Sequence, residues 1–177
     1  EFIGLEGDDV IEIGLTPNRN DAMGHWGVAR DLRSGLMHGT IDGVGPMEVG
    51  PLTLPETTSL DEALAHGCSV ALDVQAPEDC PHYLAVELSN VTVADSPEWA
   101  QKQLRAIGVQ PINNVVDATN LVLHEFGNPL HAFDLGHISG RAVVVRKANP
   151  EEPFVTLDGQ ERSLHGDDLV IADASSP

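Results

Sequence analysis

One stretch of the sequence marks the start of a predicted helix, and it reads Pro111-Ile112-Asn113-Asn114-Val115-Val116-Asp117-Ala118-Thr119-Asn120. We expect the helix to begin at Asn113 or Asn114, because an asparagine side chain can accept hydrogen bonds from the first-turn N–H groups. It should run to Phe126, where Gly127 supplies a C-terminal stop and Asn128-Pro129 prevents continuation. The stretch therefore predicts one well-bounded helix in the second half of the chain.

This predicted helix has two different faces. One face, which we expect to turn toward the core, is largely apolar and consists of Val115, Thr119, Val122 and Phe126. At 100° per residue, a polar stripe lies opposite much of it and consists of Asn113, Asp117, Asn120 and His124. A solvated face is one interpretation of this stripe. Because asparagine is disfavoured in a merely solvated helix interior, Asn120 beside Thr119 also indicates a hydrogen-bonding site.

His131 lies just past the Gly127-Asn128-Pro129 turn, in the string Pro129-Leu130-His131-Ala132-Phe133-Asp134. An imidazole at this place could orient a water, a ribose hydroxyl or a carbonyl group. A core histidine bonded to the backbone is the alternative. A metal site made of His124, His131 and His137 is disfavoured, because the turn breaks the helical register between the first two.

The flanking sequence predicts a second helix and a sheet. Ser96-Pro97-Glu98 marks a helix start with the serine hydroxyl as N-cap, and Gly108 ends that helix. Its expected buried stripe is Ala100, Leu104 and Ile107. Strands are expected at 69–74, 83–93, 141–147, 154–157, 162–164 and 169–172, with a two-residue hairpin turn at Asp158-Gly159. Together these elements predict an α+β fold with a mixed or antiparallel sheet and packed helices.

The N-terminal third predicts a strand, a helix and a linker. The strand is expected at 9–15, and the helix should be capped by Asn20 and closed by Gly35. Gly24 and Gly27 disfavour that helix by roughly 1 kcal/mol each relative to alanine. From 39 to about 68 the sequence is rich in Gly, Pro and Thr, which predicts a linker with a short helix near 60–65.

Composition and charge limit the classes of function. The 177 residues are 41% apolar and carry a formal net charge of −19, from 28 acidic and 9 basic residues. Nucleic-acid binding needs clustered Lys and Arg, so the charge argues against a free-standing RNA binder. No apolar run is long enough for a membrane span, which predicts a soluble, intracellular protein. The chain opens on Glu1 and stops at Pro177, so we expect both ends to be cuts in a longer protein.

Short chemical motifs exclude several other classes. Cys68 and Cys80 form no Cys-x-x-Cys pair, which favours free thiols over a disulfide framework or a structural metal site. The sequence contains no Gly-x-Ser-x-Gly elbow, no P-loop and no Gly-x-Gly-x-x-Gly. The residues by themselves therefore indicate an acidic α+β protein with a polar pocket near Asn120 and His131, and they leave its substrate open.

The helix stretch quoted above, together with the segment 127–134, closely resembles the β subunit of bacterial phenylalanyl-tRNA synthetases. Four further segments match the same family in order, at 12–21, 27–31, 155–160 and 168–172. The resemblance covers nearly the whole chain except about 36–68. It implies that residues 1–38 end an N-terminal β-subunit module, that 39–68 form a linker, and that 69–177 begin the editing module.

The resemblance implies a cytoplasmic heterotetramer of two α and two β subunits. In that family the α subunits hold the site for ATP and phenylalanine, so ATP and magnesium would serve the whole enzyme and no cofactor is expected within this chain. The β subunit's third and fourth modules hold an editing pocket that hydrolyses tyrosine wrongly attached to phenylalanine tRNA. The implied partners are the α subunit and that tRNA, without a membrane.

By motif match, Thr119, Asn120 and His131 would lie in the editing pocket. The other pocket residues, including a glutamate that recognises the tyrosine hydroxyl, would come from sequence beyond Pro177. Many relatives have Arg where this chain has Gln110, and that arginine is linked to editing. Two alternatives stay open: a structural or RNA-contacting module that supports the α subunit, and an unrelated small-molecule hydrolase or binding protein.

Overall fold

The computed structural model describes residues 10–55, 62, 65, 67–156 and 158–177. The chain divides into two compact units, each made of two separate stretches. We call residues 1–55 with 92–132 the helical unit, and residues 56–91 with 133–177 the sheet unit. No helix within the described residues is long and apolar enough to cross a membrane.

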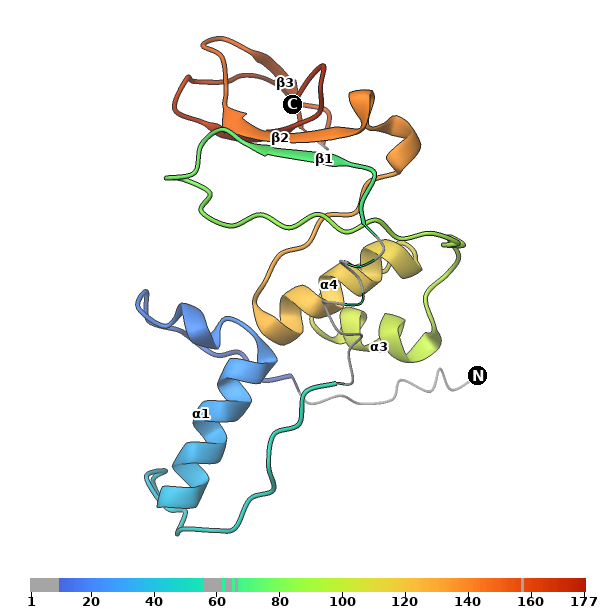
Figure 1. Ribbon diagram of the computed structural model, residues 1–177. Helices are drawn as coiled ribbons and strands as arrows, with labels where there is room; N and C mark the ends of the chain where they lie inside the picture. The colour runs from blue at the N-terminus through green and yellow to red at the C-terminus, as the bar shows by residue number, and fades with distance from the viewer. Residues whose placement is uncertain (1–9, 56–61, 63–64, 66, 157) are drawn as a thin grey trace. The chain divides into compact units, whose positions relative to one another are not determined.

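The helical unit is framed by α1 (His25–His38), α3 (Glu98–Ala106) and α4 (Asn114–Phe126), with a short 3₁₀ helix η1 (Asn20–Ala22) before α1 (Figure 1). α4 contacts both α1 and α3. Ala100 and Leu104 of α3 are buried, and Ile107 is half-buried. The apolar spacing of α3 therefore predicted the face that it turns inward, as expected for an amphipathic helix.

The sheet unit contains a three-stranded mixed sheet in the order β1 (Ala71–Val74), β2 (Ala142–Lys147), β5 (Leu169–Ala172). β1 pairs with β2 in parallel and β5 pairs with β2 antiparallel, so that Val145 lies opposite both Val74 and Ile171. A second, antiparallel pair joins β3 (Pro153–Val155) to β4 (Glu161–Ser163). Two short 3₁₀ helices, η2 (Leu135–His137) and η3 (Ser139–Arg141), precede β2. The predicted α+β class with a mixed or antiparallel sheet is confirmed.

Two predicted strands are wrong. Residues 10–15 and 83–93 have no strand pairing, although both sequences favour strands. A strand needs a neighbour to satisfy its backbone groups, and neither segment has one among the described residues. In the second segment the left-handed φ of Asn90 also interrupts the extended run. The outward side chains of Leu84 and Leu88 are 78% and 76% exposed.

The predicted N-terminal helix begins and ends later than expected. Asn20 caps no α-helix: it opens η1, and α1 starts after Gly24 and continues through Gly35 to a left-handed stop at Gly39. A Cβ built on Gly24 would lie 2.5 Å from the Gly127 backbone nitrogen, and one on Gly27 would lie 2.0 Å from the Asp21 carbonyl oxygen. These glycines, which disfavour helix in the sequence, permit close backbone approach at the start of α1.

One turn prediction also needs correction. The connection between β3 and β4 is closed by Thr156 and Gln160, whose N–H and carbonyl are 3.0 Å apart, so it is longer than a two-residue turn. Within it only Gly159 among the described residues has a left-handed φ. The short helix predicted at 60–65 falls mostly outside the described residues. The division into modules at residues 38 and 68 stays a prediction.

Candidate functional site

α4 carries most of the predicted site, and both of its ends form as the sequence predicts. Asn113 is the N-cap: its Oδ1 accepts hydrogen bonds from the N–H groups of Val115 and Val116, each at 3.0 Å. Gly127 ends the helix with a φ of +75°, and its N–H donates to the Leu123 carbonyl at 2.7 Å. A Cβ at this φ would be strained, so glycine suits the position.

The face of α4 that carries Val122 and Phe126 turns toward α1. The rings of Trp26 and Phe126 are tilted by 37° with their centroids 6.2 Å apart, which is within the range of favourable aromatic pairs. Val122 is half-buried, whereas Phe126 keeps 37% of its surface exposed. The apolar face is therefore correctly predicted in direction, but Phe126 lies at the margin of the core.

The three predicted site residues all lie in the helical unit. The Thr119 hydroxyl donates a hydrogen bond of 2.6 Å to the Val116 carbonyl of its own helix. Asn120 is half-buried, and its side chain has no hydrogen-bond partner among the described residues. His131 is exposed, four residues beyond the Gly127 turn. Thr119 is thus engaged within α4, while the amide of Asn120 keeps its donors and acceptor available to a ligand.

The polar stripe on α4 is not a solvated face. Asp117 is only 1% exposed, and it accepts hydrogen bonds from the Ser96 hydroxyl at 2.5 Å and from the Ile112 N–H at 2.9 Å. Ser96 was predicted as the N-cap of α3, but its hydroxyl points to Asp117 and caps no α3 N–H group. Buried polar groups need hydrogen-bond partners. Ser96, which was predicted as a helix cap, and Asp117, which was predicted in the polar stripe, here satisfy each other.

A surface cavity of about 450 Å³ lies in the helical unit. α3 and α4 contribute most of its lining, together with the start of α1 and the segment before η1. Its lining residues are Val10, Ile11, His25, Gln103, Ala106, Ile107, Leu121, His124 and Glu125. Thr119, Asn120 and His131 are not among them, so this cavity is separate from the predicted site residues.

Metal binding finds no support within the described part of the chain. No group of three or more His, Cys, Asp or Glu side chains there is arranged to hold a metal ion. Cys68 and Cys80 are both free thiols. His124 lines the cavity above, and His131 follows the Gly127 turn.

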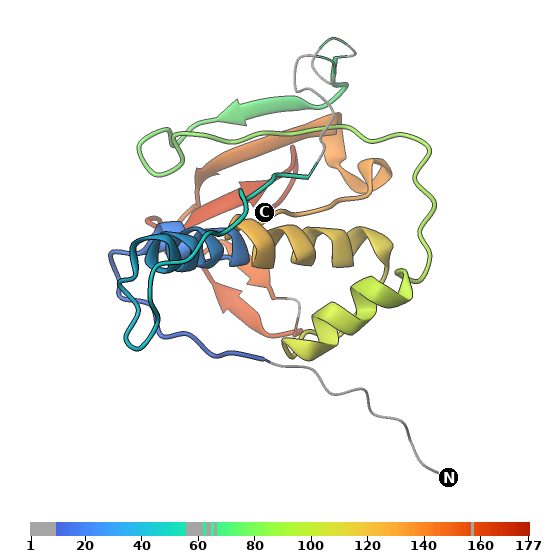
Figure 2. The same ribbon diagram turned by 90° about the horizontal axis from the view of Figure 1, so that it is seen from below.

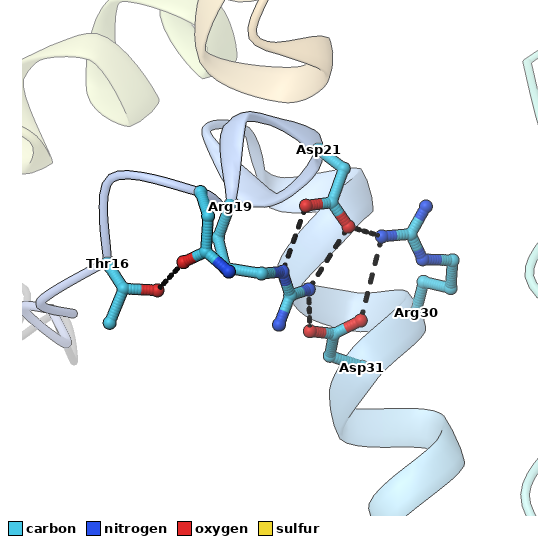
Figure 3. A network of polar contacts seen from close by, with 6 residues as sticks. Thr16, Arg19, Asp21, Arg30 and Asp31 are labelled. Atoms are coloured by element: carbon cyan, nitrogen blue, oxygen red, sulfur yellow. Dashed lines mark hydrogen bonds and ion pairs between the residues drawn. The ribbon is translucent and has the colours of Figure 1, made fainter.

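The basic side chains are mostly held by the protein's own acceptors. In the network at the start of α1, Arg19 pairs with Asp21 and Asp31, and Arg30 pairs with Asp21 (Figure 3). The hydrogen bond from Arg19 is the main cause that lowers the pKa of Asp21 to about 2. Within the described part of the chain, such contacts are made by Arg19, Arg30, Arg33, Arg105, Arg141, Arg146, Lys147 and Arg162. These cations would have to exchange an internal acceptor for a phosphate backbone.

Comparison with known proteins identifies the protein family. Residues 79–177 match the family described as the B3/4 domain, and the chain belongs to that family. Over 99% of its length the chain is 45% identical to the phenylalanine–tRNA ligase beta subunit of Porphyromonas gingivalis, of which it covers 20%. It is 43% identical over 97% of its length to that of Bacteroides thetaiotaomicron, again covering 20%. The corresponding subunit of Salinibacter ruber is 44% identical over 96% of the chain, which covers 19% of it.

The chain thus spans about a fifth of the length of the curated relatives that it matches. The resemblance to the β subunit of phenylalanyl-tRNA synthetases, seen first in the α4 stretch, is confirmed over nearly the whole chain.

Proposed function

We propose that this chain belongs to the β subunit of a bacterial-type phenylalanine–tRNA ligase, and that it begins a module that hydrolyses tyrosine wrongly esterified to phenylalanine tRNA. The similarity to phenylalanine–tRNA ligase beta subunits over nearly the whole chain carries the proposal. Thr119, Asn120 and His131 are the residues proposed for the editing site. The helical unit supports this placement, because it holds all three on α4 and the segment just after it.

The chemistry of editing suits these residue types. Hydrolysis of an aminoacyl ester needs a positioned water and a hydrogen-bond donor for the oxyanion that develops. The Asn120 amide, half-buried and without a partner among the described residues, can hold a carbonyl or a ribose hydroxyl. The exposed His131 can orient the attacking water or accept its proton. Thr119, whose hydroxyl donates to Val116, would contribute its remaining acceptor lone pairs and its methyl group.

Selection for tyrosine follows from the cost of unpaired polar groups. A pocket that hydrogen-bonds the tyrosine hydroxyl excludes phenylalanine, because the latter would leave buried donors or acceptors without partners. We propose that a glutamate outside this chain supplies that contact. The net charge of −19 is compatible with the function if other parts of the enzyme bind the body of the tRNA and this module receives only its 3′ end.

The partners and cofactors of the whole enzyme belong to the same proposal. The β subunit would assemble with an α subunit as an α2β2 heterotetramer in the cytoplasm and bind phenylalanine tRNA. ATP and magnesium would act at the aminoacylation site of the α subunit. This chain would supply no residue to that site.

The decisive experiment measures ester hydrolysis by the full-length β subunit assembled with its α subunit. We expect tyrosyl-tRNA for phenylalanine to be deacylated much faster than the correctly charged phenylalanyl-tRNA, without ATP. Equal, uncatalysed rates for both esters, in an enzyme that charges phenylalanine normally, would contradict the editing function.

A non-catalytic module that supports the α subunit or contacts RNA is the second candidate. The use of Thr119, Asn113 and Asp117 in hydrogen bonds within the protein favours a structural role for part of the motif. The internal pairing of the basic side chains disfavours RNA contact. If Asn120→Ala and His131→Ala each lowered charging and editing equally, the structural role would be the better account.

A further inference from the structure

The buried carboxylate of Asp117 links three segments of the helical unit. It lies on α4, accepts from the Ser96 hydroxyl just before α3, and accepts from the Ile112 N–H in the segment that enters α4. These two hydrogen bonds are 2.5 and 2.9 Å long, and Asp117 is 1% exposed. In Figure 2 the first turn of α3 lies beside the start of α4. We define the Asp117 latch as Asp117, Ser96 and Ile112.

Further hydrogen bonds lie next to the latch in the sequence. The side chain of Asn114 donates to the Thr92 carbonyl at 3.0 Å and accepts from the Ala94 N–H at 3.1 Å. Its own N–H donates to the Ala94 carbonyl at 2.9 Å. The Ser96 carbonyl, in turn, accepts from the Gln101 amide at 2.6 Å. The segment before α3 and the first turn of α4 are therefore fixed against each other by directional bonds rather than by apolar packing alone.

The latch also fixes how α4 is turned about its axis. Asp117 and Asn120 are three residues apart, so they lie on neighbouring parts of one helix face. A rotation of α4 that broke the bonds to Ser96 and Ile112 would turn Asn120 with it. The bond to the Ile112 N–H acts in addition on the entering segment, two residues after Gln110. One buried carboxylate thus connects the orientation of Asn120 with the course of the chain at Gln110.

We propose that Asp117 is a positioning residue for the editing reaction, holding α4 and the segment 110–112 so that Asn120 meets the ester in a productive orientation. This inference rests on the editing function proposed above. Asp117 itself is enclosed by protein, so it acts through other residues and touches no substrate. Small displacements of positioned groups lower rates strongly, on the order of 10²-fold for a shift of about 1 Å.

The test uses the full-length β subunit assembled with its α subunit and measures deacylation of tyrosyl-tRNA for phenylalanine. Asp117→Ala should lower kcat for deacylation by on the order of 10²-fold while KM for the mischarged tRNA changes little. Asp117→Asn should restore most of the rate, because its amide keeps an acceptor for Ile112 and a donor toward Ser96. The exposed Asp95, one residue before Ser96, offers the matched control Asp95→Ala, which should behave as wild type. Charging with phenylalanine should be unchanged in all three variants.

Other results would contradict either the positioning role of Asp117 or the editing function. A folded Asp117→Ala enzyme that deacylates at the wild-type rate would overturn the positioning role and leave the editing function intact. Parallel loss of charging and deacylation, with no rescue by Asp117→Asn, would reduce Asp117 to a general fold determinant. If Asp117→Ala does not assemble, Ser96→Ala decides, since it keeps the Ile112 bond: it should still slow deacylation several-fold, and an unchanged rate would overturn the inference. A wild-type enzyme without deacylation would remove the editing function and this inference with it.

Discussion

The helical unit and the sheet unit use polar side chains in different ways. The helical unit has exposed ion pairs at the start of α1, but its Asn113, Asn114 and Asp117 side chains make hydrogen bonds from buried or half-buried positions. In the sheet unit, ladders between β1, β2 and β5 supply the main order; the pair of Arg141 with Glu87 lies largely at the surface, and that of Arg146 with Glu152 is half-buried. Losing a buried partner costs about 1–3 kcal/mol, whereas an exposed ion pair contributes about 0–1 kcal/mol. Sensitivity to substitution should therefore concentrate in the helical unit, which also holds the proposed site.

The largest effect is expected for His131 in the assembled enzyme. If His131 positions the ester or its attacking water, His131→Ala should slow deacylation of tyrosyl-tRNA by roughly 10- to 10⁴-fold. Charging with phenylalanine should barely change, because we propose that it takes place on the α subunit. The exposed His82 of the sheet unit provides the control His82→Ala, which should leave both activities unchanged. Normal deacylation by a folded His131→Ala enzyme would remove this residue from the mechanism.

Gly24→Ala should lower the stability of the helical unit through a steric clash with backbone atoms. The new Cβ would lie 2.5 Å from the Gly127 nitrogen and 2.7 Å from the Glu125 carbonyl oxygen, and backbone atoms cannot move aside as a flexible side chain can. We expect the free energy of unfolding to fall by about 1–3 kcal/mol. Trp26 fluorescence can follow the unfolding, since its ring lies against Phe126.

The control for this steric argument is Gly45→Ala. No atom lies within 4 Å of a Cβ built on Gly45, and its φ is not in the left-handed region. This variant should unfold at nearly the wild-type denaturant concentration. Equal destabilisation by both substitutions would show that helix propensity or chain entropy, rather than close approach to α4, accounts for the loss.

A smaller effect is expected at the N-cap of α4. Asn113→Ala removes the acceptor for the Val115 and Val116 N–H groups, which should lower the free energy of unfolding by about 0.5–2 kcal/mol. Asn113→Asp keeps a side-chain oxygen and adds a negative charge near the positive end of the helix dipole, so it should retain most of the stability. Equilibrium denaturation of the three proteins side by side would measure this. Identical midpoints for all three would mean that the cap contributes little.

The smallest effect concerns a pair in the sheet unit and depends on pH. Glu152 accepts two hydrogen bonds from Arg146, at 2.7 and 2.9 Å, and one from the Asn149 N–H at 2.8 Å. These bonds lower the pKa of Glu152 from 4.5 to about 2, and the hydrogen bond from Arg146 is the largest cause. Because the folded-state pKa lies below the ordinary value, the stabilisation is fully present above about pH 4.5 and is lost as the pH falls toward 2.

The variant Glu152→Gln tests this dependence. It should be less stable than wild type at pH 6, and the difference between the two melting temperatures should shrink as the pH falls from 4.5 to 2. Thermal unfolding at several pH values would measure the difference. A constant difference across this range would show that the charge of Glu152 is not responsible, and would weaken the contrast drawn between the two units.

Local patterns predicted those elements whose ends are fixed by nearby residues. α4 runs from Asn114 to Phe126 as expected, because Asn113 and Gly127 satisfy or stop its terminal groups within a few residues. β2 and β5 also lie where their apolar runs predict. The segments 10–15 and 83–93 failed for the opposite reason. Their strand-like sequences need partners from elsewhere in the chain, and propensity cannot supply these.

The candidate site stays a prediction from the motif. The helical unit contains all three of its residues, on α4 and in the segment after it. The sequence did not reveal that the Thr119 hydroxyl bonds its own helix or that Asp117 is buried against Ser96. An aspartate on a helix face has the same pattern whether that face meets water or another helix, so periodicity could not distinguish the two.

The sequence by itself determined the α+β class, the bounds of α4 and the family to which the chain belongs, because each depends on short-range chemistry or on an ordered series of motifs. Only the tertiary structure decided the partners of polar groups that are distant along the chain. Ser96 meets Asp117 across 21 positions, and Gly24 approaches Gly127 across more than a hundred. Such contacts depend on how α1, α3 and α4 pack, and the free energy of packing is shared among many residues rather than encoded at any one position.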